Sequence, residues 1–193
     1  MVSELRIYFE GDRRLRPGFH EFFREIREVA FARRCYVRLV DTDGTPVTDF
    51  LTALKANPDA WNVLLLDSDA PNNASLAEFL RSKGLERSHE ESVFWMVQIM
   101  ETWFLSDIDS LAKYYGGGFR SDLLRGNPQV EQIPKADVLS RLKGATRDTQ
   151  SGEYHKTRHA PRLLAMISPS LARKAAPNCA RMFRMIFAKL SDT

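Results

Sequence analysis

Residues 61–69 read Trp-Asn-Val-Leu-Leu-Leu-Asp-Ser-Asp, an almost unbroken apolar run that ends in two aspartates. A run of this length without alternation predicts a β-strand buried on both faces, as in parallel sheets that helices cover. In open parallel sheets, ligands bind at the carboxyl ends of the strands, which is where Asp67 and Asp69 stand. The stretch therefore predicts a central strand and a site at its end.

Strand-like and helix-like segments alternate around this stretch over about the first 115 residues. The expected strands are residues 5–9, 35–40 and 61–66, and a fourth that carries Val93, Val97 and Ile99. The expected helices are roughly 18–33, 47–56, 74–83 and 107–115, with a loop over 13–18 and a turn over 41–44. Residues 101–105 fit either helix or strand. The alternation predicts an α/β fold with an open, mostly parallel sheet flanked by helices.

The pattern changes in the last third of the chain. Residues 119–134 read as irregular, and the expected helices are 136–143, 157–167, 170–175 and a last one with an apolar stripe from Cys179 to Leu190. We therefore expect an α/β domain over residues 1–118 and a basic helical extension over 119–193, packed on the same core.

The net charge of +3 hides an uneven distribution. Residues 1–119 carry 14 basic and 19 acidic side chains, a net of −5, whereas residues 120–193 carry 14 basic and 6 acidic ones, a net of +8. The two cysteines, Cys35 and Cys179, offer neither a disulfide framework nor a zinc site. With no signal peptide or apolar span in the sequence, we expect a cytoplasmic protein without membrane contact.

Two acidic clusters follow the expected central strands. Glu10-Gly11-Asp12 comes after the first strand, and Asp67 and Asp69 come after the third. Carboxylates grouped in this way repel one another unless they share a cation, and Mg²⁺ prefers such oxygen ligands. The alternative is that Asp-x-Asp only forms a turn, as expected for the similar segment 41–44.

The pairing of Glu-Gly after strand one with Asp-x-Asp after strand three resembles the Toprim domain of topoisomerases, primases and OLD-type nucleases. That resemblance implies acid/base or metal chemistry for Glu10 and Mg²⁺ binding for Asp67 and Asp69. Residues 98–105 are similar to an acidic segment of OLD-type nucleases, which implies Glu101 as a further metal ligand. The whole chain most resembles an uncharacterised Toprim-like family of domains of unknown function, often encoded beside AAA-type or OLD-type ATPases in what look like phage-defence systems.

One feature departs from that resemblance. OLD-type members often carry another acid shortly after the Glu-Gly, where this chain has Asp12 followed by arginines. Either Asp12 or the later Glu21 takes that role, or the role is missing. The number of metal ions, one or two, therefore stays open.

Basic and aromatic side chains form a second candidate group. Arg and Lys neutralise phosphate oxygens, and an aromatic ring can stack on a base. The alternative is an ordinary solvated surface. The candidates for phosphate or nucleic-acid binding are Arg13, Arg14, Arg16, Lys143, Tyr154, Lys156, Arg158, His159 and Arg162.

We therefore expect a Mg²⁺- or Mn²⁺-dependent phosphodiesterase that acts on DNA or RNA. Glu10, Lys156 and His155 are the expected catalytic residues, with His155 as general acid. The resemblance implies a separate AAA-type ATPase as partner, and because the sequence has no Walker A motif, any ATP-driven step needs another protein. The main alternative is a non-catalytic adaptor that binds nucleic acid or the ATPase. A nucleotide-sugar glycosyltransferase and a phosphoacceptor receiver are weaker alternatives.

Overall fold

The computed structural model describes residues 2–42, 44–69 and 75–192. Four strands, β1 (Glu4–Glu10), β2 (Tyr36–Thr42), β3 (Trp61–Asp67) and β4 (Val93–Met96), form one sheet in the order β2-β1-β3-β4. Every neighbouring pair is parallel. The predicted α/β class with an open parallel sheet is confirmed.

Strand β3 is buried on both faces, as its apolar run predicted. Val63 and Leu65 point into the larger hydrophobic core, whereas Leu64 and Leu66 point into the smaller one on the opposite face. Side chains alternate along a strand, so only a strand covered on both sides has no polar face. This burial places the carboxyl end of β3 between two layers of helices.

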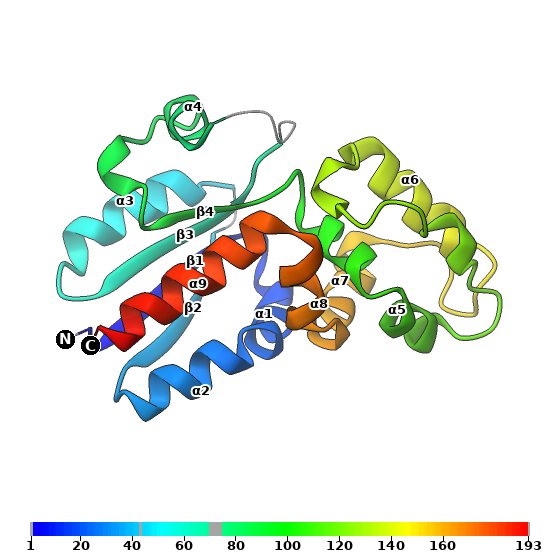
Figure 1. The fold of residues 1–193 in the computed structure, drawn as a ribbon, viewed down its shortest axis with the longest axis horizontal. Coiled ribbons are helices and arrows are strands. Elements are labelled where there is room, and N and C mark those ends of the chain that lie inside the picture. The colour runs from blue at the N-terminus through cyan, green and yellow to red at the C-terminus, as the bar shows by residue number, and fades with distance from the viewer. Residues whose placement is uncertain (1, 43, 70–74, 193) are drawn as a thin grey trace.

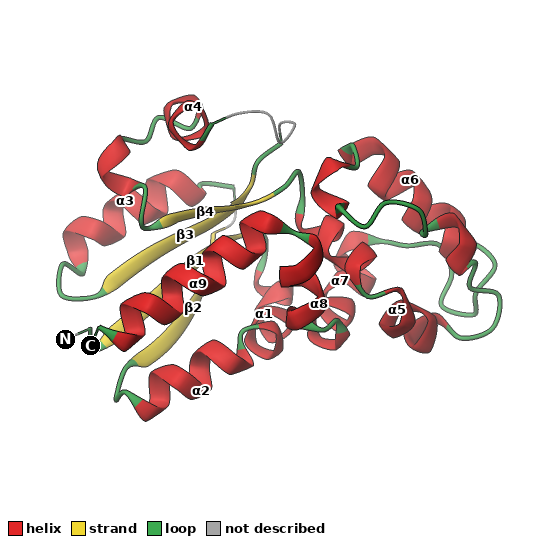
Figure 2. Ribbon diagram, in the orientation of Figure 1, coloured by secondary structure: helices red, strands yellow, loops and turns green. Residues whose placement is uncertain are grey.

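The helices cover both faces of the sheet (Figures 1 and 2). Helices α3 (Pro46–Ala56) and α4 (Leu76–Ser82) pack with the smaller core. Helices α1 (Arg16–Phe22), α2 (Arg24–Ala32) and α9 (Pro177–Ser191) pack with the larger one. None of the described helices is long and apolar enough to span a membrane.

The remaining helices lie beyond one end of the sheet (Figure 1). They are α5 (Ile108–Tyr115), α6 (Lys135–Thr146), α7 (Lys156–Met166) and α8 (Pro169–Ala175). The larger core continues into these four helices, each of which contributes buried side chains to it: Leu111, Leu142, Leu163 and Ala172. The division of the chain at residue 118 stays a prediction.

The loop predicted over residues 13–18 is wrong. The chain forms a short 3₁₀ helix, η1 (Arg13–Leu15), and then enters α1, with Pro17 in its first turn. Locally, Asp12 caps η1 by accepting a hydrogen bond from the Arg14 amide at 2.7 Å. Gly18 lets α1 pack closely on α7, because a Cβ there would lie 2.6 Å from the carbonyl oxygen of Pro161. The cap and this packing together organise the segment.

Other boundaries also differ from the predictions. The helix predicted over 18–33 is two helices, and residues 101–105 belong to a 3₁₀ helix, η3 (Met100–Ser106). Strand β4 ends at Met96, before the predicted Val97 and Ile99. Asp41 and Thr42 of the predicted turn belong to β2, while its Asp43, and Ala74 of the helix predicted over 74–83, lie outside the described residues.

Candidate functional site

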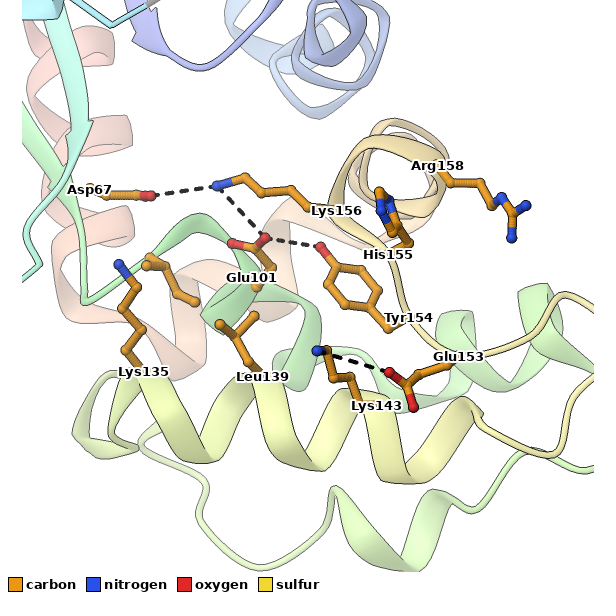
Figure 3. A pocket seen from close by; sticks show the side chains of 11 residues that line it. Asp67, Glu101, Lys135, Leu139, Lys143, Glu153, Tyr154, His155, Lys156 and Arg158 are labelled. Atoms are coloured by element: carbon orange, nitrogen blue, oxygen red, sulfur yellow. Dashed lines mark hydrogen bonds and ion pairs between the residues drawn. The ribbon is translucent and has the colours of Figure 1, made fainter.

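A cavity of about 620 Å³ lies where the carboxyl end of β3 meets η3, α6 and the start of α7 (Figure 3). Acidic side chains come from β3, from η3 and from Glu153 in the segment between α6 and α7, and lysine and arginine side chains come from α6 and α7. The residues lining it are Asp67, Ile99, Glu101, Lys135, Leu139, Lys143, Glu153, Tyr154, His155, Lys156 and Arg158.

Asp67 is held at the end of β3 by two backbone groups. Its Oδ1 accepts a hydrogen bond from the amide of Met100 at 2.8 Å, and its own amide donates to Glu10 Oε2 at 3.0 Å. Only 7% of the residue is exposed. The structure thus brings Glu10 beside Asp67, as predicted, although Glu10 is not among the described residues that line the cavity.

Glu101 is almost fully buried at the start of η3. Its Oε1 accepts a hydrogen bond from the hydroxyl of Tyr154 at 3.0 Å. Its Oε2 is buried and has no hydrogen-bond partner among the described residues. A buried carboxylate oxygen without a partner is costly, so this atom is suited to a cation that the chain itself does not supply.

Lys156 joins the two carboxylates. Its Nζ lies 3.8 Å from Asp67 Oδ2 and 3.8 Å from Glu101 Oε1 (Figure 3). The pKa of Asp67 is raised to about 7: burial is the main cause, the nearby Glu101 and Glu10 carboxylates add to it, and the Lys156 ammonium opposes them. The site therefore holds negative charge that one lysine neutralises only in part.

The raised pKa of Asp67 predicts a pH-dependent stability. In the native state this pKa is about 7 against 3.8 for the free group, so unfolding releases a proton between these values. The contribution of Asp67 to the free energy of unfolding is therefore fully present below about pH 4 and lost as the pH rises through 7. We expect the melting temperature of Asp67→Asn, relative to wild type, to rise between pH 4.5 and 8 in thermal unfolding.

The matched control for this measurement is Asp109→Asn, which removes an exposed carboxylate from α5. Its melting temperature should keep a constant difference from wild type over the same range. A constant difference for Asp67→Asn as well would contradict the raised pKa.

Asp69 differs from Asp67, because it pairs with lysines other than Lys156. Its backbone is in the left-handed region, with φ of 54°, and its carboxylate pairs with Lys135 at 2.8 Å and Lys83 at 3.7 Å. The hydrogen bond that Lys135 Nζ donates to Asp69 Oδ1 also raises the pKa of Lys135. Among the described residues, no three His, Cys, Asp or Glu side chains form a ready metal-binding group. Metal binding by Glu10, Asp67, Asp69 and Glu101 stays a prediction.

Tyr154 and His159 differ from the predicted phosphate contacts, because the structure buries both. They are 3% and 1% exposed. The Tyr154 hydroxyl donates a hydrogen bond to Glu101 Oε1. Nδ1 of His159 accepts hydrogen bonds from the amide of His155 and the hydroxyl of Tyr115. Burial lowers the pKa of His159, which favours the neutral ring. Both side chains support the start of α7 and do not present a surface for stacking.

The basic residues predicted for phosphate binding fall into two groups. Lys143, His155, Lys156 and Arg158 line the cavity, whereas the described lining residues do not include Arg13, Arg14, Arg16 or Arg162. In the second group, Arg14 pairs with Asp12 and Arg16 pairs with Asp41. Ion pairs with Asp12 and Asp41 therefore engage Arg14 and Arg16 outside the described cavity lining.

Helix α6 contributes two cavity residues that are not among the candidates from the sequence. Lys135 and Leu139 line the cavity together with Lys143. Their spacing of four residues places all three on one face of a helix. This spacing is visible in the sequence and could have identified them.

The comparisons with known proteins agree with this architecture. A family model described as a domain of unknown function, DUF4276, matches residues 12–186. The chain belongs to the DUF4276 family. No curated protein matches the sequence of this DUF4276 domain.

Among solved structures, the DUF4276 domain is similar to the C-terminal region of the Burkholderia pseudomallei OLD protein. The TM-score is 0.51 at 13% sequence identity, over 100% of this chain and 98% of the other. This likeness shows a shared fold, in line with the resemblance to OLD-type proteins noted from the sequence.

Proposed function

We propose that this DUF4276 domain is a Mg²⁺-dependent phosphodiesterase that acts on nucleic acid. The observation that supports it best is the pair of buried carboxylates, Asp67 and Glu101, at the carboxyl edge of a parallel sheet, inside a cavity whose other walls carry cations. Acidic groups suit a metal ion and the surrounding cations suit phosphates, so one cavity combines both requirements.

The residues present fit a divalent cation. The partnerless Oε2 of Glu101 and the raised pKa of Asp67 both indicate carboxylates that added positive charge would stabilise. Asp67, Glu101 and the adjacent Glu10 would hold the ion after a shift of their side chains, because in the described part of the chain they do not form a ready metal-binding group, and Asp69 would join only by leaving Lys135. When bound, Mg²⁺ acts as a Lewis acid on a phosphoryl oxygen.

The protein's own cations would bind and orient the substrate. Lys156 and Arg158 stand at the start of α7 and line the cavity, where they would neutralise phosphate oxygens. Figure 3 shows Lys156 directed at the two carboxylates and Arg158 directed away from them. His155 precedes them and also lines the cavity, so its ring is placed to donate a proton to the leaving oxygen. Buried Tyr154 would keep Glu101 in place through its hydrogen bond.

Metal binding is the first test. We expect millimolar Mg²⁺ or Mn²⁺ to raise the melting temperature of the wild-type chain, because the ion binds the native state and not the unfolded one. The rise should vanish in Glu101→Gln, which keeps the shape but removes the charge, and should persist in the control Asp109→Asn. Wild-type protein that shows no shift and no cleavage of plasmid or RNA with metal would rule out the proposal.

A second candidate is a non-catalytic adaptor that binds nucleic acid. The observation that favours it is Lys156, which already supplies a cation to both buried carboxylates. An adaptor would bind nucleic acid in a salt-dependent manner that neither Mg²⁺ nor Asp67→Asn alters.

We also propose a separate ATPase as partner, which the resemblance to domains encoded beside AAA-type or OLD-type ATPases implies. The sequence has no Walker A motif, so any ATP-driven step would need that second protein. Addition of such an ATPase should raise cleavage only in the presence of ATP.

A further inference from the structure

Helix α6 forms one wall of the cavity, and we propose that this wall makes the site selective for a single-stranded nucleic acid over a duplex. The inference rests on the proposal that the cavity receives nucleic acid, and it adds the form of that substrate. Three side chains of α6 carry it: Lys135, Leu139 and Lys143, which all line the cavity.

The three side chains form a row with a cation at each end. Successive members are four residues apart, so the row runs along one face of α6 for about 12 Å. Figure 3 shows Lys135, Leu139 and Lys143 following one another along the helix and facing Tyr154 and Lys156 across the cavity. A row of this length suits a chain with repeated negative charges better than it suits a single phosphate.

The space between the two lysines is apolar. Leu139 lies there on α6, and Ile99 lines the same cavity. A ligand bound only through its phosphates would make no favourable contact with an apolar wall. The base and sugar of an unpaired nucleotide have apolar faces that can pack against it. Paired bases in a duplex keep these faces stacked on one another.

The size of the cavity also favours a single strand over a duplex. At about 620 Å³ it falls within the range of small-molecule pockets. That volume accommodates one or two nucleotides of a single strand, but a double helix is too wide to enter and would reach the acidic site only after a base left the stack.

The lysines can exchange their present partners for phosphates. Lys143 Nζ lies 3.9 Å from Glu153, and both side chains are about half exposed, which is typical of a weak surface pair. Lys135 is also about half exposed in its pair with Asp69. Phosphate oxygens would therefore compete with these carboxylates at low cost.

The test measures binding by fluorescence anisotropy, with EDTA present so that no cleavage occurs. The probes are a fluorescein-labelled twelve-residue oligothymidylate and a hairpin duplex with the same label. We expect the single strand to bind at least tenfold more tightly. Lys143→Gln should reduce the slope of log K against log salt by about 0.7, the value for one phosphate contact on a single strand.

Leu139→Ser separates apolar contact from charge. It should weaken binding of the single strand about threefold through lost apolar contact and leave the salt slope unchanged. Leu139→Met, which keeps an apolar side chain, should retain wild-type affinity. The matched control for Lys143→Gln is Lys113→Gln, an exposed lysine of α5 outside the cavity lining, which should change neither affinity nor slope.

Three outcomes would overturn the inference: equal or tighter binding of the hairpin, displacement of the oligothymidylate by thymidine monophosphate at equal concentration, or an unchanged salt slope in a folded Lys143→Gln variant. Each of them leaves the metal-induced rise in melting temperature untouched. If metal does not raise the melting temperature but the single strand still binds more tightly than the hairpin, the result contradicts the proposed phosphodiesterase activity and not the strand preference.

Discussion

Asp67→Asn is expected to lower metal-dependent cleavage of nucleic acid by a factor of at least about 100, the loss seen when one group that stabilises transition-state charge is removed. Asp67 is held by backbone hydrogen bonds at the end of β3 and shares the Lys156 ammonium with Glu101, so its carboxylate is fixed beside the second proposed metal ligand. The measurement is the initial rate of cleavage at saturating Mg²⁺ or Mn²⁺.

The same substitution should not destabilise the metal-free protein near pH 8. The buried carboxylate of Asp67 is unfavourable there, as its raised pKa indicates, and an amide of the same shape removes that charge. A folded variant without activity would thus separate function from stability. Asp109→Asn is the control for the rate, and an Asp67→Asn enzyme within threefold of wild type would exclude a catalytic or metal-binding role for Asp67.

Trp103→Ala is expected to lower the free energy of unfolding by about 3–5 kcal/mol, because it leaves a large cavity in the main core. Trp103 is fully buried in η3 and stacks on Phe22, with ring planes 10° apart. Phe22 in turn contacts Phe183 of α9, so the indole lies where the sheet layer and the C-terminal helices meet. Urea unfolding followed by circular dichroism gives the measurement.

The control for the core is Phe31→Ala, since Phe31 is 85% exposed and its loss should change stability by less than about 0.5 kcal/mol. Trp103→Phe should cost less than the alanine variant, because it refills part of the space and removes an indole N–H that has no acceptor among the described residues. Similar stabilities for Trp103→Ala and Phe31→Ala would contradict the assigned core.

The strands and their order of appearance were predictable because their signal is local. The apolar run of 61–66 identified β3 without any knowledge of its neighbours, and turn residues after it located Asp67 at the end of the strand. The start of α1 was not predictable. Its arginines and Pro17 looked like a loop, although Asp12 caps η1 and Pro17 suits a first helical turn. The close packing of Gly18 on α7 became visible only in the tertiary structure.

The candidate site was predictable only in part. Asp67, Glu101 and Lys156 were all singled out, but their meeting depends on the approach of β3, η3 and α7. Tyr154 and His159 looked like exposed phosphate contacts because their neighbours in sequence are charged, yet tertiary packing buries both. Asp69 looked equivalent to Asp67, and its ion pair with Lys135 of α6 makes it different.

By itself, the sequence determined the fold class and the acidic end of β3, since apolar periodicity and the residues that end a strand act over a few neighbouring positions. The tertiary structure alone decided which charges share the cavity and that α6 supplies a wall with two lysines around Leu139. Electrostatic and packing interactions act through space between distant segments, so they become visible only when the helices are placed on the sheet.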